Sequence, residues 1–153
     1  MALQKGDKAP EFLLYDTDKK SVTLHDILGK KTVFAFFPGA FTGVCTKEMC
    51  TFRDNLTQFN DLGGSVYGIS VDGPSANHGF AFHNSLNFPI LSDFTREVSK
   101  KYCGLHDDFW GVKGYSVAKR SVFVIDEKGN ISYAWITDNP GELPDIDAIQ
   151  KAL

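Results

Sequence analysis

A short apolar run at residues 32–37 (Thr-Val-Phe-Ala-Phe-Phe) constrains the fold of this chain more than any other feature. Neighbouring residues of a strand point to opposite faces, so a strand that is apolar throughout must be covered on both faces. Pro38 ends the run, since proline lacks the N–H that a sheet requires. Residues 44–62 follow, with apolar side chains at positions 49, 52, 56 and 59, which is the spacing of one helix face. The region therefore predicts a central buried strand followed by an amphipathic helix.

The rest of the chain alternates between strand and helix signals. Gly63 and Gly64 stop the first helix, and residues 127–130 (Glu-Lys-Gly-Asn) predict a hairpin turn. We predict further strands at residues 65–71, 88–91, 121–126 and 131–136, and further helices at residues 75 to about 86, about 94–102 and 145–153. No repeat, linker or low-complexity tract interrupts them. The pattern therefore predicts one layered α/β domain over residues 1–153.

Composition narrows the classes of partner. The 153 residues suffice for one well-developed core, and 42% of them are hydrophobic. A net charge of −3 gives no reason to expect nucleic acid or an anionic membrane as a partner. The apolar runs are far too short to cross a membrane, and the N-terminus lacks the apolar segment of a signal peptide. Three cysteines without framework spacing predict a reducing, cytoplasmic setting.

Cys45 lies where the predicted strand gives way to the helix. Unpaired backbone N–H groups and the positive end of the helix dipole favour a thiolate at that point. Helical spacing also puts Cys45 on the apolar stripe, at the strand ends where open α/β sheets commonly bind ligands. Thr42 is placed to cap the helix or to donate to the sulfur region, and Glu48 lies one turn further on. A buried structural cysteine is the alternative interpretation.

The residues around Cys45 resemble a known active-site signature. Residues 38–50 read Pro-Gly-Ala-Phe-Thr-Gly-Val-Cys-Thr-Lys-Glu-Met-Cys, and their Pro-x-x-x-Thr-x-x-Cys pattern is similar to that of the peroxiredoxins, thiol enzymes that reduce hydroperoxides. Residues 8–12 (Lys-Ala-Pro-Glu-Phe) resemble the family's opening segment, so the resemblance spans nearly the whole chain. It implies a thioredoxin-like fold, in which a central mixed sheet is flanked by helices. It also implies antioxidant catalysis without an organic cofactor or a metal, and the four histidines show no ligand spacing.

The resemblance further implies roles for individual residues. Cys45 would attack the peroxide and become a sulfenic acid. Thr42 would hydrogen-bond the peroxide and the thiolate, and Pro38 would shield the sulfur from water. Arg120, in the segment Ala-Lys-Arg-Ser-Val-Phe-Val-Ile-Asp, would point its guanidinium at the thiolate and stabilise the oxygen on which charge develops. Glu48 is expected to help fix the hydrogen bonds of the pocket.

A second cysteine, Cys50, follows Cys45 by five residues. Residues 46–54 (Thr-Lys-Glu-Met-Cys-Thr-Phe-Arg-Asp) resemble the peroxiredoxin Q branch, also called bacterioferritin comigratory protein, in which a cysteine at this spacing resolves the sulfenic acid. Residues 37–44 are closer to the branch that contains peroxiredoxin five. On a helix, five residues separate the cysteines by about 140° and roughly 7.5 Å along the axis. The helix must therefore unwind before they can form a disulfide.

Helical spacing places Cys50 near Asp54, Thr57 and Asp61, on the polar side of the helix. Cys103, at a predicted helix end, is interpreted as a partly buried thiol and is the next candidate for resolution if Cys50 is inert. A one-cysteine mechanism, with an external thiol, stays open.

Other functions are compatible with parts of the sequence. A thioredoxin-like disulfide oxidoreductase requires Cys-x-x-Cys, whereas this chain has Cys-x₄-Cys. A non-enzymatic binding or holdase role would not require Thr42, Cys45 and Arg120 together. The expected partners are a hydroperoxide and a dithiol reductant such as thioredoxin, with the protein a monomer or a homodimer. Three aromatic residues in predicted loops either line an apolar mouth suited to alkyl peroxides or cap the core: Phe41, Phe109 and Trp110.

Overall fold

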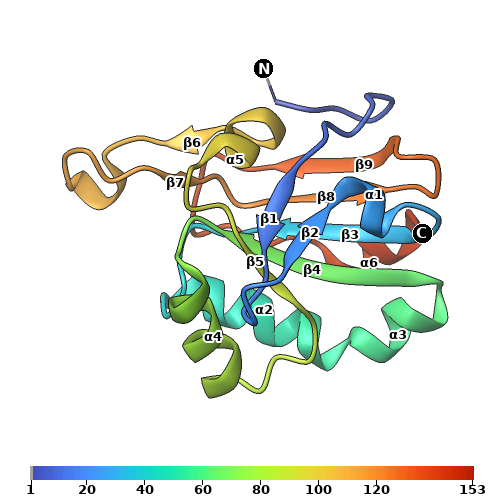
Figure 1. The fold of residues 1–153 in the computed structure, drawn as a ribbon, viewed down its shortest axis with the longest axis horizontal. Coiled ribbons are helices and arrows are strands. Elements are labelled where there is room, and N and C mark those ends of the chain that lie inside the picture. Colours follow the sequence, from blue (N-terminus) through green and yellow to red (C-terminus); the bar gives the residue numbers. More distant parts are fainter. Residues whose placement is uncertain (1) are drawn as a thin grey trace.

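A computed structural model of the protein describes residues 2–153 and has a seven-stranded sheet at its centre (Figure 1). The order across the sheet is β2 (Ser21–Thr23), β1 (Leu13–Tyr15), β5 (Ile90–Ser92), β4 (Gly64–Ser70), β3 (Lys31–Phe36), β8 (Ser121–Ile125) and β9 (Ile131–Ile136). Strands β3, β4 and β5 are parallel, and every other neighbouring pair is antiparallel. The predicted mixed sheet is therefore confirmed.

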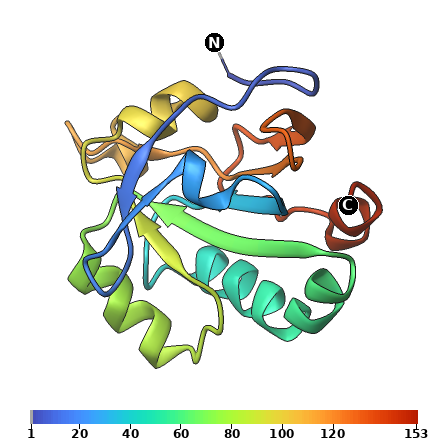
Figure 2. The same ribbon diagram turned by 45° about the vertical axis from the view of Figure 1, so that its right-hand side comes forward.

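Helices cover both faces of the sheet. One face carries α2 (Gly43–Asp54), α3 (Leu56–Asp61), α4 (Pro74–His83) and α6 (Ile146–Lys151), and the other carries α1 (Leu24–Ile27) and α5 (Glu97–Tyr102). Figure 2 shows α2, α3 and α4 below the sheet and α5 above it. This three-layer arrangement is the predicted α/β architecture.

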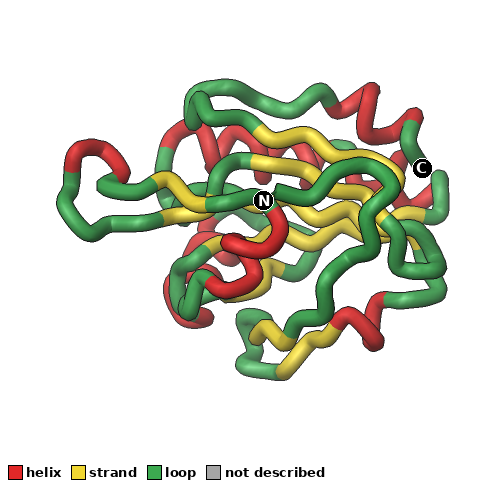
Figure 3. Tube along the Cα trace, turned by 90° about the horizontal axis from the view of Figure 1, so that it is seen from above, coloured by secondary structure: helices red, strands yellow, loops and turns green. Residues whose placement is uncertain are grey.

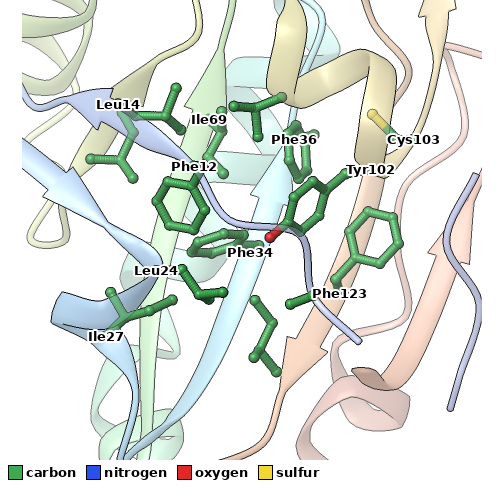
Figure 4. Close-up of a cluster of buried hydrophobic side chains, with 14 of the residues drawn as sticks. Phe12, Leu14, Leu24, Ile27, Phe34, Phe36, Ile69, Tyr102, Cys103 and Phe123 are labelled. Carbon is green, nitrogen blue, oxygen red and sulfur yellow. The ribbon is translucent and has the colours of Figure 1, made fainter. Parts of the chain in front are cut away.

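Strand β3 divides the core, as its uninterrupted apolar sequence predicts. Phe34 and Phe36 point to the face covered by α5, where both rings lie within 6.0 Å of the ring of Tyr102, centroid to centroid (Figure 4). Val33 and Ala35 point to the other face and join the cluster that contains Cys45 and the apolar stripe of α2. The alternation along one strand therefore produces two hydrophobic clusters, each sealed by its own helices.

The predicted helix at residues 44–62 is two helices. The chain leaves helical geometry at Asn55, where φ is −106° and ψ is 7°, between α2 and α3. The Asn55 side chain donates to the carbonyl of Thr51 at 2.8 Å. A short amide side chain that bonds the preceding turn in this way competes with the helical backbone, which explains the break inside a continuous apolar stripe.

Several short elements lie outside the sequence-based expectations. They are β1, β2, α1, β6 (Leu105–His106), β7 (Val117–Ala118) and the 3₁₀ turn η1 (Phe109–Gly111). Each has four residues or fewer, too short for a period of 2 or 3.6 to be visible in the sequence. Strands β6 and β7 pair with each other, and residues 105–118 form an arm that projects from the sheet, here called the β6–β7 arm (Figure 3). Within residues 2–153, no helix has the length and apolar character needed to span a membrane.

Candidate active site

Cys45 lies in the first turn of α2, with 2% of its surface exposed. Thr42 occupies the N-cap position with extended backbone angles, φ −94° and ψ 150°. Its hydroxyl does not accept from the helix, as a capping side chain would, but donates to the carbonyl of Gly39 at 2.7 Å. The N–H groups of the first turn are therefore not capped by Thr42, and their partial positive charge stays directed at the region of the Cys45 sulfur.

Arg120 approaches Cys45 from the other end of the sequence. The two residues are 75 positions apart, yet Nη2 of Arg120 donates to Sγ of Cys45 at 3.3 Å. Strand β8 pairs antiparallel with β3, with Ser121 opposite Phe36, so the residue before β8 lies level with the end of β3. The sheet register thus brings the arginine to the N-terminus of α2. Only 1% of the Arg120 surface is exposed, so solvent screens this contact weakly.

Two further groups hold the guanidinium. Nη1 donates to Oε1 of Glu48 at 2.7 Å, and both side chains are 1% exposed. Nε and Nη2 donate to the carbonyl of Pro140 at 3.3 Å and 2.8 Å. Burial raises the pKa of Glu48 to about 7, although the charge of Arg120 acts in the opposite direction. The planar fork of arginine suits this role, because it reaches a carboxylate, a carbonyl and a sulfur at once.

A pocket of about 280 Å³ opens above the Cys45 sulfur. Its lining is Pro38, Thr42, Gly43, Val44, Cys45, Phe109, Trp110, Arg120, Pro140 and Gly141. The structure therefore brings Pro38, Thr42, Cys45 and Arg120 together, and Glu48 lies behind the pocket wall in contact with Arg120. In the part of the chain that the structure describes, no group of three or more His, Cys, Asp or Glu side chains could hold a metal ion.

Of the three aromatic residues considered for the pocket mouth, two line the pocket and one does not. Phe109 and Trp110, on the β6–β7 arm, line the pocket and stack with ring centroids 4.7 Å apart. Phe41 does not line it: its ring packs on Phe80 of α4 at 5.5 Å, and 58% of its surface is exposed. Phe41 has a positive φ of 63°. Its side chain therefore points in a different direction from that of a residue in extended backbone.

Pro140 is a pocket residue that sequence reasoning missed. It contributes its carbonyl oxygen, which every residue type possesses, so side-chain chemistry offers no signal. The only indication is the Asn-Pro-Gly turn at residues 139–141, which places an irregular backbone after β9.

Cys50 lies further along α2, which is continuous across both cysteines. It is half-buried and faces the end of α4, with Sγ 3.8 Å from Oδ1 of Asn84. Arg53 reinforces this junction, since Nη1 donates to the Asn84 carbonyl at 2.6 Å. The prediction that Cys50 lies on the polar side of one helix, near Asp54, Thr57 and Asp61, is thus wrong in part: Cys50 is half-buried beside Asn84, and the helix breaks at Asn55, before Thr57 and Asp61.

Cys103 belongs to the opposite core cluster, beside Tyr102 (Figure 4). It is 1% exposed, and burial raises the pKa of its thiol to about 12. Cys45 belongs to the cluster under α2, so the sheet lies between these two cysteines.

The chain is similar over most of its length to known proteins of one family. Residues 5–134 match the model of the AhpC/TSA family. A putative peroxiredoxin of Mycobacterium tuberculosis is 42% identical over 132 residues, covering 86% of this chain and 84% of that protein. The peroxiredoxin Bcp of Escherichia coli is 35% identical over 133 residues, covering 87% of this chain and 85% of that protein. Among solved structures, peroxidoxin BcpB of M. tuberculosis superposes with a TM-score of 0.80 at 31% identity, covering 90% of this chain and 88% of that one.

The family match at residues 5–134 spans β1 to β8, α2 and the segment that contains Arg120. The predicted resemblance to peroxiredoxins, and to the peroxiredoxin Q and Bcp branch in particular, is therefore confirmed, and so is the thioredoxin-like fold. This chain belongs to the AhpC/TSA family and is a peroxiredoxin, a thiol peroxidase.

Proposed function

We propose that Cys45 is the residue with which this peroxiredoxin reduces hydroperoxides. The observation that carries the proposal is the 3.3 Å contact between Arg120 Nη2 and Cys45 Sγ at the base of the pocket. The thiolate attacks the outer oxygen of ROOH and the O–O bond breaks. The sulfur keeps the hydroxyl as a sulfenic acid, and the departing alkoxide takes a proton to become ROH.

The neighbouring groups divide the remaining work. Arg120 stabilises the negative charge as it moves from sulfur to the leaving oxygen. Thr42, at the pocket wall, hydrogen-bonds the peroxide, and Pro38 keeps water from the sulfur. Glu48 holds the guanidinium in place through its 2.7 Å contact. Phe109 and Trp110 make one wall apolar, which favours alkyl hydroperoxides beside hydrogen peroxide.

Cys50 is proposed to resolve the sulfenic acid. Its thiol displaces the sulfenic hydroxyl as water, and a Cys45–Cys50 disulfide forms. Two observations favour Cys50 over Cys103: it shares α2 with Cys45, and Cys103 lies in the core cluster on the other face of the sheet. A dithiol protein such as thioredoxin then reduces the disulfide by thiol exchange. We place this cycle in the cytoplasm, because it requires a reducing pool.

We also propose that residues 1–153 act as one domain, since both core clusters share β3. A disulfide oxidoreductase mechanism would need two cysteines within reach at a helix start, whereas these two are five residues apart in an intact helix. A one-cysteine mechanism is the remaining alternative.

One experiment separates these mechanisms. Intact protein is treated with one equivalent of hydrogen peroxide and examined by mass spectrometry and peptide mapping. We expect a Cys45–Cys50 disulfide and no peroxide consumption by Cys45→Ser. A stable Cys45 sulfenic acid with Cys50 still alkylatable would establish the one-cysteine mechanism. Substantial activity in Cys45→Ser would refute the assignment of the nucleophile.

A further inference from the structure

A buried polar network lies under the loop that connects β3 to α2. Three of its residues are almost fully buried: Ser70, Asn77 and Ser92. The Asn77 side chain donates to the Ser92 hydroxyl at 3.0 Å, and the Ser70 hydroxyl lies 2.9 Å from Oδ1 of Asn77. The network joins β4, α4 and β5. Buried polar groups are costly unless they are paired, and a fully paired set is rigid.

Asp72 connects this network to the active-site loop. Its Oδ2 lies 3.0 Å from the Ser70 hydroxyl and accepts the backbone N–H of Ala40 at 2.8 Å. The Asp72 carbonyl also accepts from the Asn77 side chain at 3.4 Å. Ser70 of β4 therefore holds the Asp72 carboxylate, Asn77 of α4 holds its backbone carbonyl, and the carboxylate binds the loop from a fixed position.

The loop has few other backbone hydrogen bonds. Within residues 2–153, the Ala40 N–H is the one backbone N–H between Gly39 and Thr42 that has a hydrogen-bond partner. Phe41, the next residue, has φ of 63°, a left-handed conformation that is strained for a bulky side chain. A strained segment keeps its shape only when its surroundings impose it. Asp72 supplies that restraint between two pocket residues, Pro38 on one side and Thr42 on the other.

We propose that Asp72 is a positioning residue for peroxide reduction, which anchors the loop through Ala40 and thereby holds Pro38 and Thr42 against the Cys45 sulfur. The inference rests on the proposed function of Cys45. Asp72 does not line the pocket, so it acts through the loop and not on the peroxide itself.

The test compares Asp72→Ala with Asp72→Asn. The rate constant of Cys45 oxidation by hydrogen peroxide, followed by stopped-flow tryptophan fluorescence, should fall about tenfold in Asp72→Ala, the scale of one lost hydrogen bond to a charged acceptor. Asp72→Asn should recover most of the rate, because an amide oxygen still accepts the Ala40 N–H. Alkylation of Cys45 by iodoacetamide, measured on its peptide, should stay within about twofold of the unmodified protein, because it needs the thiolate but not Thr42.

A matched control is Asp93→Ala. Asp93 is also a buried carboxylate that accepts backbone N–H groups, those of Val98 and Ser99 in α5, away from the pocket. The Asp93→Ala variant should be less stable than the unmodified protein, and its rate of Cys45 oxidation should be unchanged. An unchanged oxidation rate in Asp72→Ala overturns the inference. The inference is also overturned if Asp72→Ala loses Cys45 oxidation and Cys45 alkylation to the same extent and Asp93→Ala shows the same losses, because that result indicates general destabilisation. Absence of Cys45 oxidation in the unmodified protein would instead refute the proposed function.

Discussion

The chemistry proposed for Cys45 depends on a contact made by one side chain. Arg120 is buried with three different acceptors, the Cys45 sulfur, the Glu48 carboxylate and the Pro140 carbonyl. A buried cation without partners would be very unfavourable, so the two oxygen acceptors fix the guanidinium and leave one N–H directed at the sulfur. The arginine is thus oriented before any peroxide arrives, which is the condition for effective electrostatic catalysis.

Replacing Arg120 with methionine should slow oxidation of Cys45 on the order of 10²-fold, the scale of losing one transition-state donor. The side chain volume is largely kept, so the pocket walls stay in place. Stopped-flow kinetics with hydrogen peroxide measures the effect. Arg120→Lys is the matched variant: it keeps the charge but cannot reach all three acceptors, and we expect an intermediate rate. Equal rates in all three proteins would remove Arg120 from the mechanism.

Glu48 should make the stability of the fold depend on pH. Burial raises its pKa from 4.5 to about 7, so the folded protein keeps the proton at pH values where the unfolded chain has lost it. The unfolded state then binds fewer protons, and this group lowers the free energy of unfolding as pH rises from 4.5 to about 7.

Urea titrations of the unmodified protein and of Glu48→Gln at pH 5, 6, 7 and 8 isolate this contribution, because glutamine does not titrate. The free energy of unfolding of Glu48→Gln, relative to the unmodified protein, should increase from pH 5 to 7 and then level off. A difference that stays constant from pH 5 to 8 would contradict this prediction, because a Glu48 whose pKa is not raised is largely ionised in both the folded and the unfolded state over this range.

At the scale of elements, the proposed cycle gives α2 two incompatible tasks: to hold Cys45 at the pocket and to let Cys50 reach it. As a continuous helix it presents Cys45 to the pocket, and in the same state it keeps Cys50 about 7.5 Å away along the axis. The contacts of Cys50 and Arg53 with Asn84 hold that state against α4. Disulfide formation therefore requires local unwinding, a transition whose free energy is set by these contacts and the first turns of the helix.

Oxidised protein should lose helix at residues 43–50. Hydrogen exchange measured by mass spectrometry should show protection in these residues when the protein is reduced and at least a tenfold faster exchange after peroxide treatment, while β3 and β4 keep their protection. Cys50→Ser provides the control, because it is oxidised at Cys45 but cannot form the disulfide, and its α2 should stay protected. Equal protection of α2 in reduced and oxidised protein, or a Cys45–Cys103 link, would contradict the proposed resolution step.

At the scale of the whole molecule, the sheet separates two thiols with different properties. Cys45 belongs to the cluster under α2, and Cys103 to the cluster under α5. The Cys103 sulfur lies near the Ser99 and Gly104 carbonyls, in a site where burial raises its pKa to about 12. This thiol stays protonated at neutral pH and serves as a small apolar core residue.

Cys103→Ala should therefore leave peroxidase turnover unchanged and lower the free energy of unfolding by about 1 kcal/mol, the scale of a small core truncation. Coupled peroxidase assays and urea unfolding measure the two quantities. In the folded, unmodified protein, Cys103 should also resist alkylation under conditions that modify Cys45. A large loss of turnover in Cys103→Ala, at a protein concentration and temperature where it is folded, would give Cys103 a role in the cycle.

Much of the site could be predicted because its signals are local. The site begins with three features that are adjacent in the chain: the apolar run of β3, Pro38 and the start of α2. A buried strand followed by an amphipathic helix can pack in only a few ways. The break at Asn55 could not be predicted because it depends on a single side-chain bond, and the six short elements could not be predicted because they have too few residues for a period of 2 or 3.6 to be visible. Arg120 was identified through the family resemblance, and its own local sequence would suit an exposed residue equally well.

The position of a cysteine at a strand–helix boundary can be read from the chain alone, because hydrophobic periodicity and the helix start are properties of consecutive residues. The surroundings of that sulfur depend on the three-dimensional fold. The antiparallel register of β8 on β3 brings Arg120 across 75 positions, the turn after β9 supplies the Pro140 carbonyl, and the end of β4 places Asp72 beneath Ala40. These contacts follow from the order and register of strands in the sheet, which depend on the simultaneous packing of both faces and not on any local pattern.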